Sequence, residues 1–148
     1  MTGSGPEFYS PRSLEEALGV RKTTGAIPLA GGTDLLVRRR SWTGTLPDIH
    51  EPVVFVGALS ELQGIEEKSA AGRRSLRVGA GVTYAELLAH PRLPELLKGS
   101  IIELAAPGLR NVATLAGNIC NASPAADAVC ALYALDASVE LASAKGTR

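Results

Sequence analysis

Helical and strand-like patterns of apolar residues alternate along the first part of the chain. Residues 13–18 carry leucine and alanine at helical spacing, and Ser13 is a suitable N-cap. The apolar run at 26–29 predicts a short strand, which leads into a weaker helical pattern that Thr33 is placed to cap. The β-branched run at 53–56 predicts a buried strand. These elements indicate a βαβ-like beginning.

The middle of the chain carries a hairpin signal followed by helical segments. A Gly-containing turn at residues 69–74 separates two strand-like stretches. Thr83 is placed to cap a helix, with Glu86 three residues on as its capping-box partner. Residues 93–97 predict a further short helix.

The last third predicts one helix and one strand. The helix begins at Pro124 with Ser123 as its N-cap, and the residues that it turns inward are Ala128, Cys130, Ala131, Leu132 and Leu135. Alternating apolar residues at 137–142 predict a strand. The chain is therefore predicted to be α+β.

We expect two subdomains, divided in the loop that holds Trp42, Gly44 and Pro47. Residues 1–50 form a small βαβ-like subdomain with the first ligand loop. Residues 51–148 form a second, mixed-sheet α/β subdomain.

Two glycine-rich and polar segments are the candidate binding residues. Gly31 and Gly32 follow the first predicted strand and free the backbone to turn its amides toward one point, which is how phosphate nests form. Either segment alone is more often a tight turn or a helix cap than a ligand site. Together they predict a ligand with two phosphates.

The second segment spans residues 110–127 and is predicted to be a loop that runs into a helix start. Asn118, Asn121 and Ser123 offer short hydrogen-bonding side chains, and Gly117 allows close backbone approach. Amides in the first turn of the following helix favour an anion.

In this order the segments resemble the FAD-binding subunit or domain of the molybdenum hydroxylases, which include xanthine dehydrogenases and the medium subunit of carbon monoxide dehydrogenases. Residues 30–36 resemble the family's first flavin loop, and residues 114–127 resemble its second. Residues 76–87 are similar to the linking strand and helix.

The resemblance implies that the two loops clamp the pyrophosphate and ribityl parts of FAD. Phosphates repel carboxylates, so Asp34 and Asp127 are expected to brace loops or accept from hydroxyls. Leu104 is a candidate for packing against the isoalloxazine, although a core leucine is the commoner role. The implied FAD-binding residues are Leu29, Ala30, Gly31, Gly32, Thr33, Asp34, Leu35, Leu104, Thr114, Gly117, Asn118, Asn121, Ser123 and Asp127.

The resemblance also implies an assembly. The family's flavoprotein subunits are about twice this length, so the chain is expected to be an N-terminal portion of the molybdopterin dehydrogenase flavoprotein architecture, an FAD-binding type-2 fold, incomplete at its C-terminus. A large subunit would carry molybdopterin, a small one [2Fe-2S] clusters, and FAD would pass electrons to NAD or another acceptor. No residue of this chain is then expected to be catalytic.

Composition narrows the alternatives. Fifteen basic residues balance fifteen acidic ones, which gives no electrostatic signature for nucleic acid or an anionic membrane. No signal peptide or membrane-length apolar run is visible, so a cytoplasmic location is expected. His50, His90, Cys120 and Cys130 lack metal-ligand spacing.

Three alternatives compete with this interpretation. A dinucleotide-binding Rossmann motif is excluded at Gly79-Ala80-Gly81 because Tyr84 stands where the third glycine belongs. Within the family, the sequence around Asn118 favours a xanthine dehydrogenase-like subunit over a carbon monoxide dehydrogenase-like one. A truncated, non-catalytic assembly module that binds no FAD is the other candidate.

Overall fold

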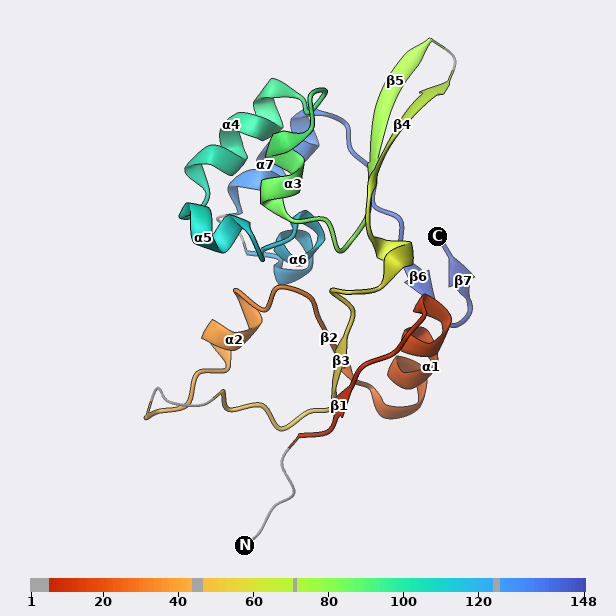
Figure 1. Cartoon of the computed structure of the whole chain (residues 1–148), viewed down its shortest axis with the longest axis vertical. Helices are drawn as coiled ribbons and strands as arrows, with labels where there is room; N and C mark the ends of the chain where they lie inside the picture. Colours follow the sequence, from red (N-terminus) through yellow and green to blue (C-terminus); the bar gives the residue numbers. More distant parts are fainter. Residues whose placement is uncertain (1–5, 44–46, 71, 124–125) are drawn as a thin grey trace, which may run out of the picture.

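The computed structural model describes residues 6–43, 47–70, 72–123 and 126–148. Its amino-terminal part is a parallel three-stranded sheet of order β1-β3-β2, with α1 packed against β3 (Figure 1). The elements are β1 (Phe8–Tyr9), α1 (Leu14–Thr24), β2 (Ile27–Leu29), α2 (Leu35–Arg38) and β3 (Val53–Phe55). The βαβ-like beginning is confirmed.

Helix α1 begins and ends where its sequence favours a helix boundary. The Ser13 side chain accepts a hydrogen bond from the Glu16 amide at 3.1 Å, as predicted. The helix ends at Gly25, which has φ +72° and donates to the Arg21 carbonyl. Beneath it, Ala17 packs with Val54 in a small core.

The middle strand β3 ties the amino-terminal part together. Val53 and Val54 are fully buried, as the β-branched run predicted, whereas Phe55 is 38% exposed. The strand pairs with both β1 and β2, although it follows the expected division at residue 50. That division stays a prediction.

A short 3-10 helix, η1 (Ser60–Leu62), leads into the predicted hairpin of β4 (Ile65–Ala70) and β5 (Arg73–Val78). The hairpin projects beyond the helices in Figure 1. Both strands are mostly exposed.

Of the five helices α3 to α7, all except α5 contribute buried residues to the second and larger core. They are α3 (Tyr84–Ala89), α4 (Glu95–Glu103), α5 (Pro107–Arg110), α6 (Leu115–Asn121) and α7 (Asp127–Ala134). Their fully buried side chains include Tyr84, Leu87 and Ile101. The α+β class is confirmed.

Several predicted boundaries were wrong. The helix predicted at 93–97 begins at Glu95 and continues through Glu103, because Leu97 and Ile101 are one turn apart and share the core. Helix α7 begins at Asp127 with Ala126 as its N-cap rather than Ser123. It turns Ala128, Ala131 and Leu132 toward the core as predicted, but Cys130 and Leu135 are exposed, because Cys130 lies on the other side of the helix and Leu135 is its C-cap. Pro124, predicted at the first helical position, lies outside the described residues.

The predicted strand at 137–142 was also wrong, except at its last residue. Val139 and Leu141 are 53% and 47% exposed, so their alternation does not mark a buried face. The described strands nearby are β6 (Ala142–Ser143) and β7 (Gly146–Thr147), which form a separate small hairpin. Residue 140 is connected to β5 by a side-chain contact and not by strand pairing: Arg77 Nη2 donates to Glu140 Oε1 at 3.0 Å.

Candidate functional site

The glycine loop follows β2 directly and leads into α2. Gly32 has φ +70°, a conformation that glycine adopts freely. Asp34, not Thr33 as predicted, occupies the N-cap position of α2, and its side chain makes no capping bond. The amides of residues 31–34 donate no hydrogen bond to any group in the described part of the chain. They are therefore free to bind an external acceptor.

The second predicted loop is largely a helix. Residues 115–121 form α6, and Thr114 is its N-cap, accepting from the Gly117 amide at 3.0 Å. The prediction was wrong because Gly117 and Asn118 favour loops, while the buried Leu115 and the partly buried Ile119 sit one turn apart on the core. The helix ends at Ala122, whose φ is +50°.

The structure brings the two segments together. A Cβ placed on Gly31 would lie 1.8 Å from the Val112 carbonyl oxygen and 2.5 Å from its carbon. Two backbones therefore touch here, immediately before Thr114. A second contact joins the same segments, since Arg38 Nη2 donates to the Asn121 carbonyl at 3.1 Å. Residues about eighty positions apart in sequence thus border one site.

Two buried polar atoms near this junction have no hydrogen-bond partner among the described residues: Asn118 Oδ1 and the Tyr84 hydroxyl. Asn118 lies in α6, one turn after Thr114. Tyr84 begins α3, and its amide donates to the Ala113 carbonyl at 2.9 Å. Buried polar groups are normally paired, so both atoms are candidates for partners outside the chain or after a loop movement.

The N-terminal end of helix α3 is held against the second segment. Thr83 and Thr114 form an antiparallel bridge. Thr83 and Glu86 form the predicted capping box, with the Thr83 amide 2.7 Å from Glu86 Oε2. The hydrogen bond from that amide, followed by the Thr83 hydroxyl, lowers the pKa of Glu86.

An open hollow of about 530 Å³ lies beside this bridge. Gly57, which borders it, also approaches the glycine loop, since a Cβ there would lie 3.5 Å from the Ala30 Cα. Its lining residues are Gly57, Ala58, Gln63, Gly81, Thr83, Ala85, Glu86 and Asn111. Sequence patterns gave no signal for this hollow, because three separated segments build it.

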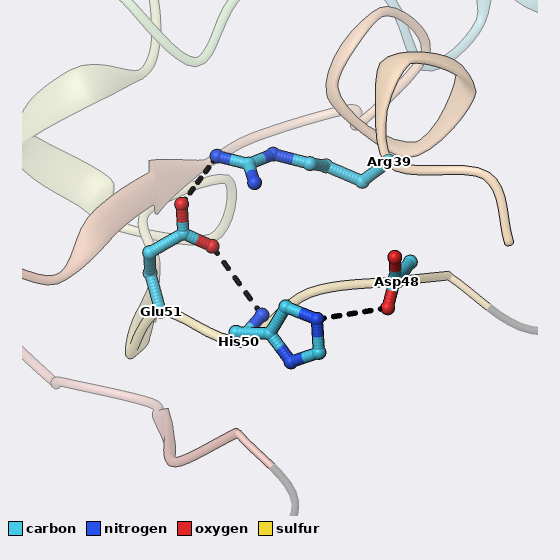
Figure 2. Close-up of polar contacts among 4 residues, drawn as sticks. All are labelled: Arg39, Asp48, His50 and Glu51. Carbon is cyan, nitrogen blue, oxygen red and sulfur yellow. Dashed lines mark hydrogen bonds and ion pairs between the residues drawn. The ribbon is translucent and has the colours of Figure 1, made fainter.

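The loop between α2 and β3 is tied by polar contacts (Figure 2). Arg39 forms an ion pair with Glu51, and Glu51 Oε2 also accepts from the His50 amide at 3.3 Å. Hydrogen bonds from the Glu51 amide and then from Arg39 lower the pKa of Glu51, against the opposing effect of burial. His50 in turn lies 3.0 Å from Asp48. Arg39 therefore anchors the end of α2 to the start of β3.

The remaining predicted residues lie at different distances from this junction. Leu104 is the C-cap of α4 and packs on the larger core, which is the commoner role for such a leucine. Ser123 follows α6, and its carbonyl accepts from the Ala126 amide at 3.1 Å. The side chain of Asp127 lies outside the described part. Leu29 and Leu35 flank the glycine loop and are half-buried.

Sequence patterns did not reveal Tyr84 as part of this junction, and they did not single out Val112 within the predicted segment 110–127. Arg38 belongs to the basic cluster 38–40, for which a solvated face is the commoner role and the border of a diphosphate site or of a partner subunit is the alternative. Val112 acts through its backbone, which no side-chain pattern reveals. Tyr84 stood out in the sequence only as an obstacle to a different motif. The described residues contain no group of three or more His, Cys, Asp or Glu side chains able to hold a metal ion. In the same part of the chain, no helix has both the length and the apolarity needed to cross a bilayer.

Comparisons with known proteins show which family the chain resembles. The family described as the FAD binding domain in molybdopterin dehydrogenase matches residues 4–148. The nicotinate dehydrogenase FAD-subunit of Eubacterium barkeri is 32% identical over 149 residues, covering 96% of this chain and 47% of that protein. The putative xanthine dehydrogenase FAD-binding subunit of Escherichia coli (strain K12) is 36% identical over 124 residues, covering 81% of this chain and 40% of that protein.

Solved structures show the same fold. A chain of carbon monoxide dehydrogenase from Hydrogenophaga pseudoflava superposes with a TM-score of 0.85 at 27% identity, covering all of this chain and 50% of that one. Quinoline 2-oxidoreductase from Pseudomonas putida 86 gives a TM-score of 0.79 at 28% identity. The chain thus spans about half the length of the relatives it matches.

Proposed function

Because the chain belongs to the family of FAD-binding domains in molybdopterin dehydrogenases, we propose that it binds FAD between the glycine loop and the start of α6. The contact of Gly31 with Val112 carries this proposal. Because of this contact, the unpaired amides of residues 31–34 lie close to the start of residues 114–127, the segment that resembles the family's second flavin loop.

The donors and acceptors here fit FAD. Unpaired amides at residues 31–34 suit the diphosphate, because anions bind where several backbone N–H groups converge. Asn118 Oδ1 is an acceptor, so it suits a cofactor hydroxyl rather than a phosphate. We keep the fourteen residues expected from sequence as the candidate FAD-binding set. Two of them support the site from outside it: Thr114 by capping α6, and Leu104 by packing on the larger core.

The residues of this chain bind FAD and orient it. The glycine loop holds the diphosphate, and α6 fixes the spacing of its partner segment. FAD bound here supplies the redox chemistry of an electron relay between [2Fe-2S] clusters and NAD or another acceptor. No side chain of this chain is assigned as a general acid or base.

We assign the chain to the flavoprotein subunit of a molybdopterin-dependent hydroxylase or dehydrogenase. Its partners are then a large molybdopterin-binding subunit and a small iron–sulfur subunit, in the cytoplasm. The higher identity to the xanthine dehydrogenase subunit, 36% against 27% for the carbon monoxide dehydrogenase medium chain of Afipia carboxidovorans, supports a xanthine dehydrogenase-like complex.

An absorbance titration of the purified protein with FAD tests the proposal. Gly32→Val and Asn118→Leu are the test variants. Because Gly32 has φ +70°, any side chain there is strained, so Gly25→Val is the matched control. Gly25 has φ +72°, and an added Cβ there would have no atom within 4 Å. It is the C-cap of α1.

We expect the wild-type protein and Gly25→Val to bind FAD, and the two test variants to bind it at least about fivefold more weakly, since a lost hydrogen bond is worth about 1 kcal/mol or more. Equal affinity in all four proteins would place the cofactor elsewhere. Absence of binding in the wild type would favour the assembly module instead.

A further inference from the structure

Three consecutive arginines stand at the end of α2, and their side chains make different contacts. Arg38 Nη2 donates to the Asn121 carbonyl at 3.1 Å, across 83 positions of sequence. Arg39 forms the ion pair that ties α2 to the start of β3 (Figure 2). The side chain of Arg40 makes no hydrogen bond or ion pair with any group in the described part of the chain. Among these three described residues, Arg38 is therefore the one that reaches the second segment.

The bond from Arg38 is the second of two contacts between the segment of the glycine loop and the segment of α6. The first is the backbone approach of Gly31 to Val112, ahead of both helices. The second joins the last residue of α2 to the last residue of α6. Asn118, whose buried Oδ1 is proposed to bind a cofactor hydroxyl, lies between the two contacts along α6. The spacing of the two segments is therefore fixed at two points.

Backbone hydrogen bonds connect Arg38 to the glycine loop. The Arg38 amide donates to the Asp34 carbonyl at 2.9 Å, and the Leu36 amide donates to the Gly32 carbonyl at 2.9 Å. Helix α2 is four residues long and buries none of them. So short a helix is not stable by itself, so its position depends on the contacts that its side chains make. A displacement at Arg38 would therefore move the glycine loop as well.

We propose that Arg38 is a positioning residue for FAD: its guanidinium holds α2 against the end of α6 and so keeps the glycine loop and Asn118 at the spacing that one FAD molecule spans. This inference rests on the proposed function. Arg38 acts through the Asn121 carbonyl and does not touch the diphosphate, because the glycine loop precedes α2 whereas Arg38 ends it.

Arg38→Met removes the donors of this side chain and is the main test variant. Arg38 is exposed, so the variant is expected to fold. Its FAD affinity should fall about fivefold, which corresponds to a lost hydrogen bond of about 1 kcal/mol. Arg38→Lys keeps the charge and a donor but not the planar fork, so it should regain part of the affinity.

Arg40→Met is the matched control. It removes the same positive charge two positions away, at an exposed side chain that has no partner in the described part of the chain. It should bind FAD like the wild type. An effect of overall charge on FAD would instead weaken binding in Arg40→Met and Arg38→Met alike.

Arg39→Met separates positioning of the two segments from a general loosening of α2. It breaks the ion pair with Glu51 and so releases α2 from β3, but it leaves the bond from Arg38 to α6 in place. The melting temperature of the FAD-free protein should fall at least as far in Arg39→Met as in Arg38→Met, since that ion pair is half-buried. FAD affinity should fall less in Arg39→Met than in Arg38→Met.

The dependence of FAD affinity on salt separates positioning from direct contact with phosphate. The acceptor of the Arg38 bond is a neutral carbonyl, so the dissociation constants of Arg38→Met and of the wild type should keep the same ratio between about 0.05 M and about 0.5 M salt. If the guanidinium contacted the diphosphate, this ratio would fall as salt rises, because salt screens the attraction between the two charges.

Four results would overturn the inference while FAD binding by the wild type leaves the proposed function standing. They are wild-type affinity in Arg38→Met, an equal loss in Arg40→Met, an equal loss in Arg39→Met, and a ratio that falls as salt rises. If the wild type binds no FAD, both proposals fail.

Discussion

Gly31→Ala should separate the two segments that form the proposed cleft. The added Cβ would lie 1.8 Å from the Val112 oxygen, 2.5 Å from the Val112 carbon and 3.1 Å from the Ala113 nitrogen. All three atoms belong to the backbone, so no side-chain rotation relieves the clash. Ordinary non-bonded contact needs about 3.5 Å, so the backbones must move apart by roughly 1.5 Å.

This displacement sets the expected magnitudes. Overpacking of this kind costs about 1–3 kcal/mol, which for a chain of this size lowers the melting temperature by about 3 °C per kcal/mol. Loss of the joint grip on FAD should weaken binding by about tenfold or more, since each 1.4 kcal/mol is about a factor of ten.

Thermal unfolding and FAD titration measure the two effects, with Gly19→Ala as the control. Gly19 lies in α1 with nothing within 4 Å of an added Cβ. Alanine there should stabilise the helix by up to about 1 kcal/mol and leave FAD affinity unchanged. If Gly31→Ala kept both the melting temperature and the FAD affinity of the wild type, the contact with Val112 could not be what forms the site.

Further expectations concern local structure and are measured by chemical and thermal unfolding. Thr83→Ala should cost about 1 kcal/mol at neutral pH by removing the capping box. Because the folded protein lowers the Glu86 pKa from 4.5, this stabilisation is complete above that value and is lost as pH falls below it, so the difference from wild type should shrink in acid. Arg110→Met should destabilise by about 1–2 kcal/mol, since Arg110 Nη1 donates to the Ile102 carbonyl at 2.9 Å and the Ala105 carbonyl at 2.7 Å. Ala105→Gly should stabilise by roughly 0.5–1 kcal/mol, because Ala105 has φ +107°.

Each of these has a contrary result. A Thr83→Ala deficit that stayed constant down to about pH 3 would remove Glu86 from the explanation. Wild-type stability in Arg110→Met would mean that water replaces both of its hydrogen bonds. A loss of stability in Ala105→Gly would show that backbone entropy outweighs the strain at this turn.

Elements with local signals could be predicted from sequence. Ser13 and Thr83 cap helices because a hydroxyl before an apolar periodic run meets a free amide within the same turn. The hairpin around residues 69–74 follows from its turn and its flanking strands. These features depend on neighbours a few positions away.

Elements that depend on tertiary contacts could not be predicted from sequence. Helix α6 contains Gly117 and Asn118, which disfavour helices locally, but core packing of Leu115 and the Thr114 cap outweigh that preference. At 137–142, alternation predicted a strand, yet in the described part of the chain no strand pairs with residues 137–140, and Leu141 pairs only with Arg148 at the end of the β6–β7 hairpin. In both cases the outcome depends on which side chains are buried, and the sequence alone does not give this.

The candidate site also has a part that could be predicted from sequence and a part that could not. Its two segments were identified by residue type, and their convergence was predicted from the family resemblance. The residue that Gly31 touches, Val112, was not predicted, because a backbone carbonyl leaves no trace in the side-chain pattern. Tyr84 was missed for a related reason, since only its burial without a partner makes its hydroxyl noteworthy.

The most direct test of the central claim is an amide NMR titration of the isotopically labelled protein with FAD. We expect the amide signals of Gly31 and Gly32 to shift together with that of Gly117, with one shared dissociation constant. Shifts confined to one of these segments, or appearing only around Gly99 in α4, would contradict the claim that both segments bind one cofactor.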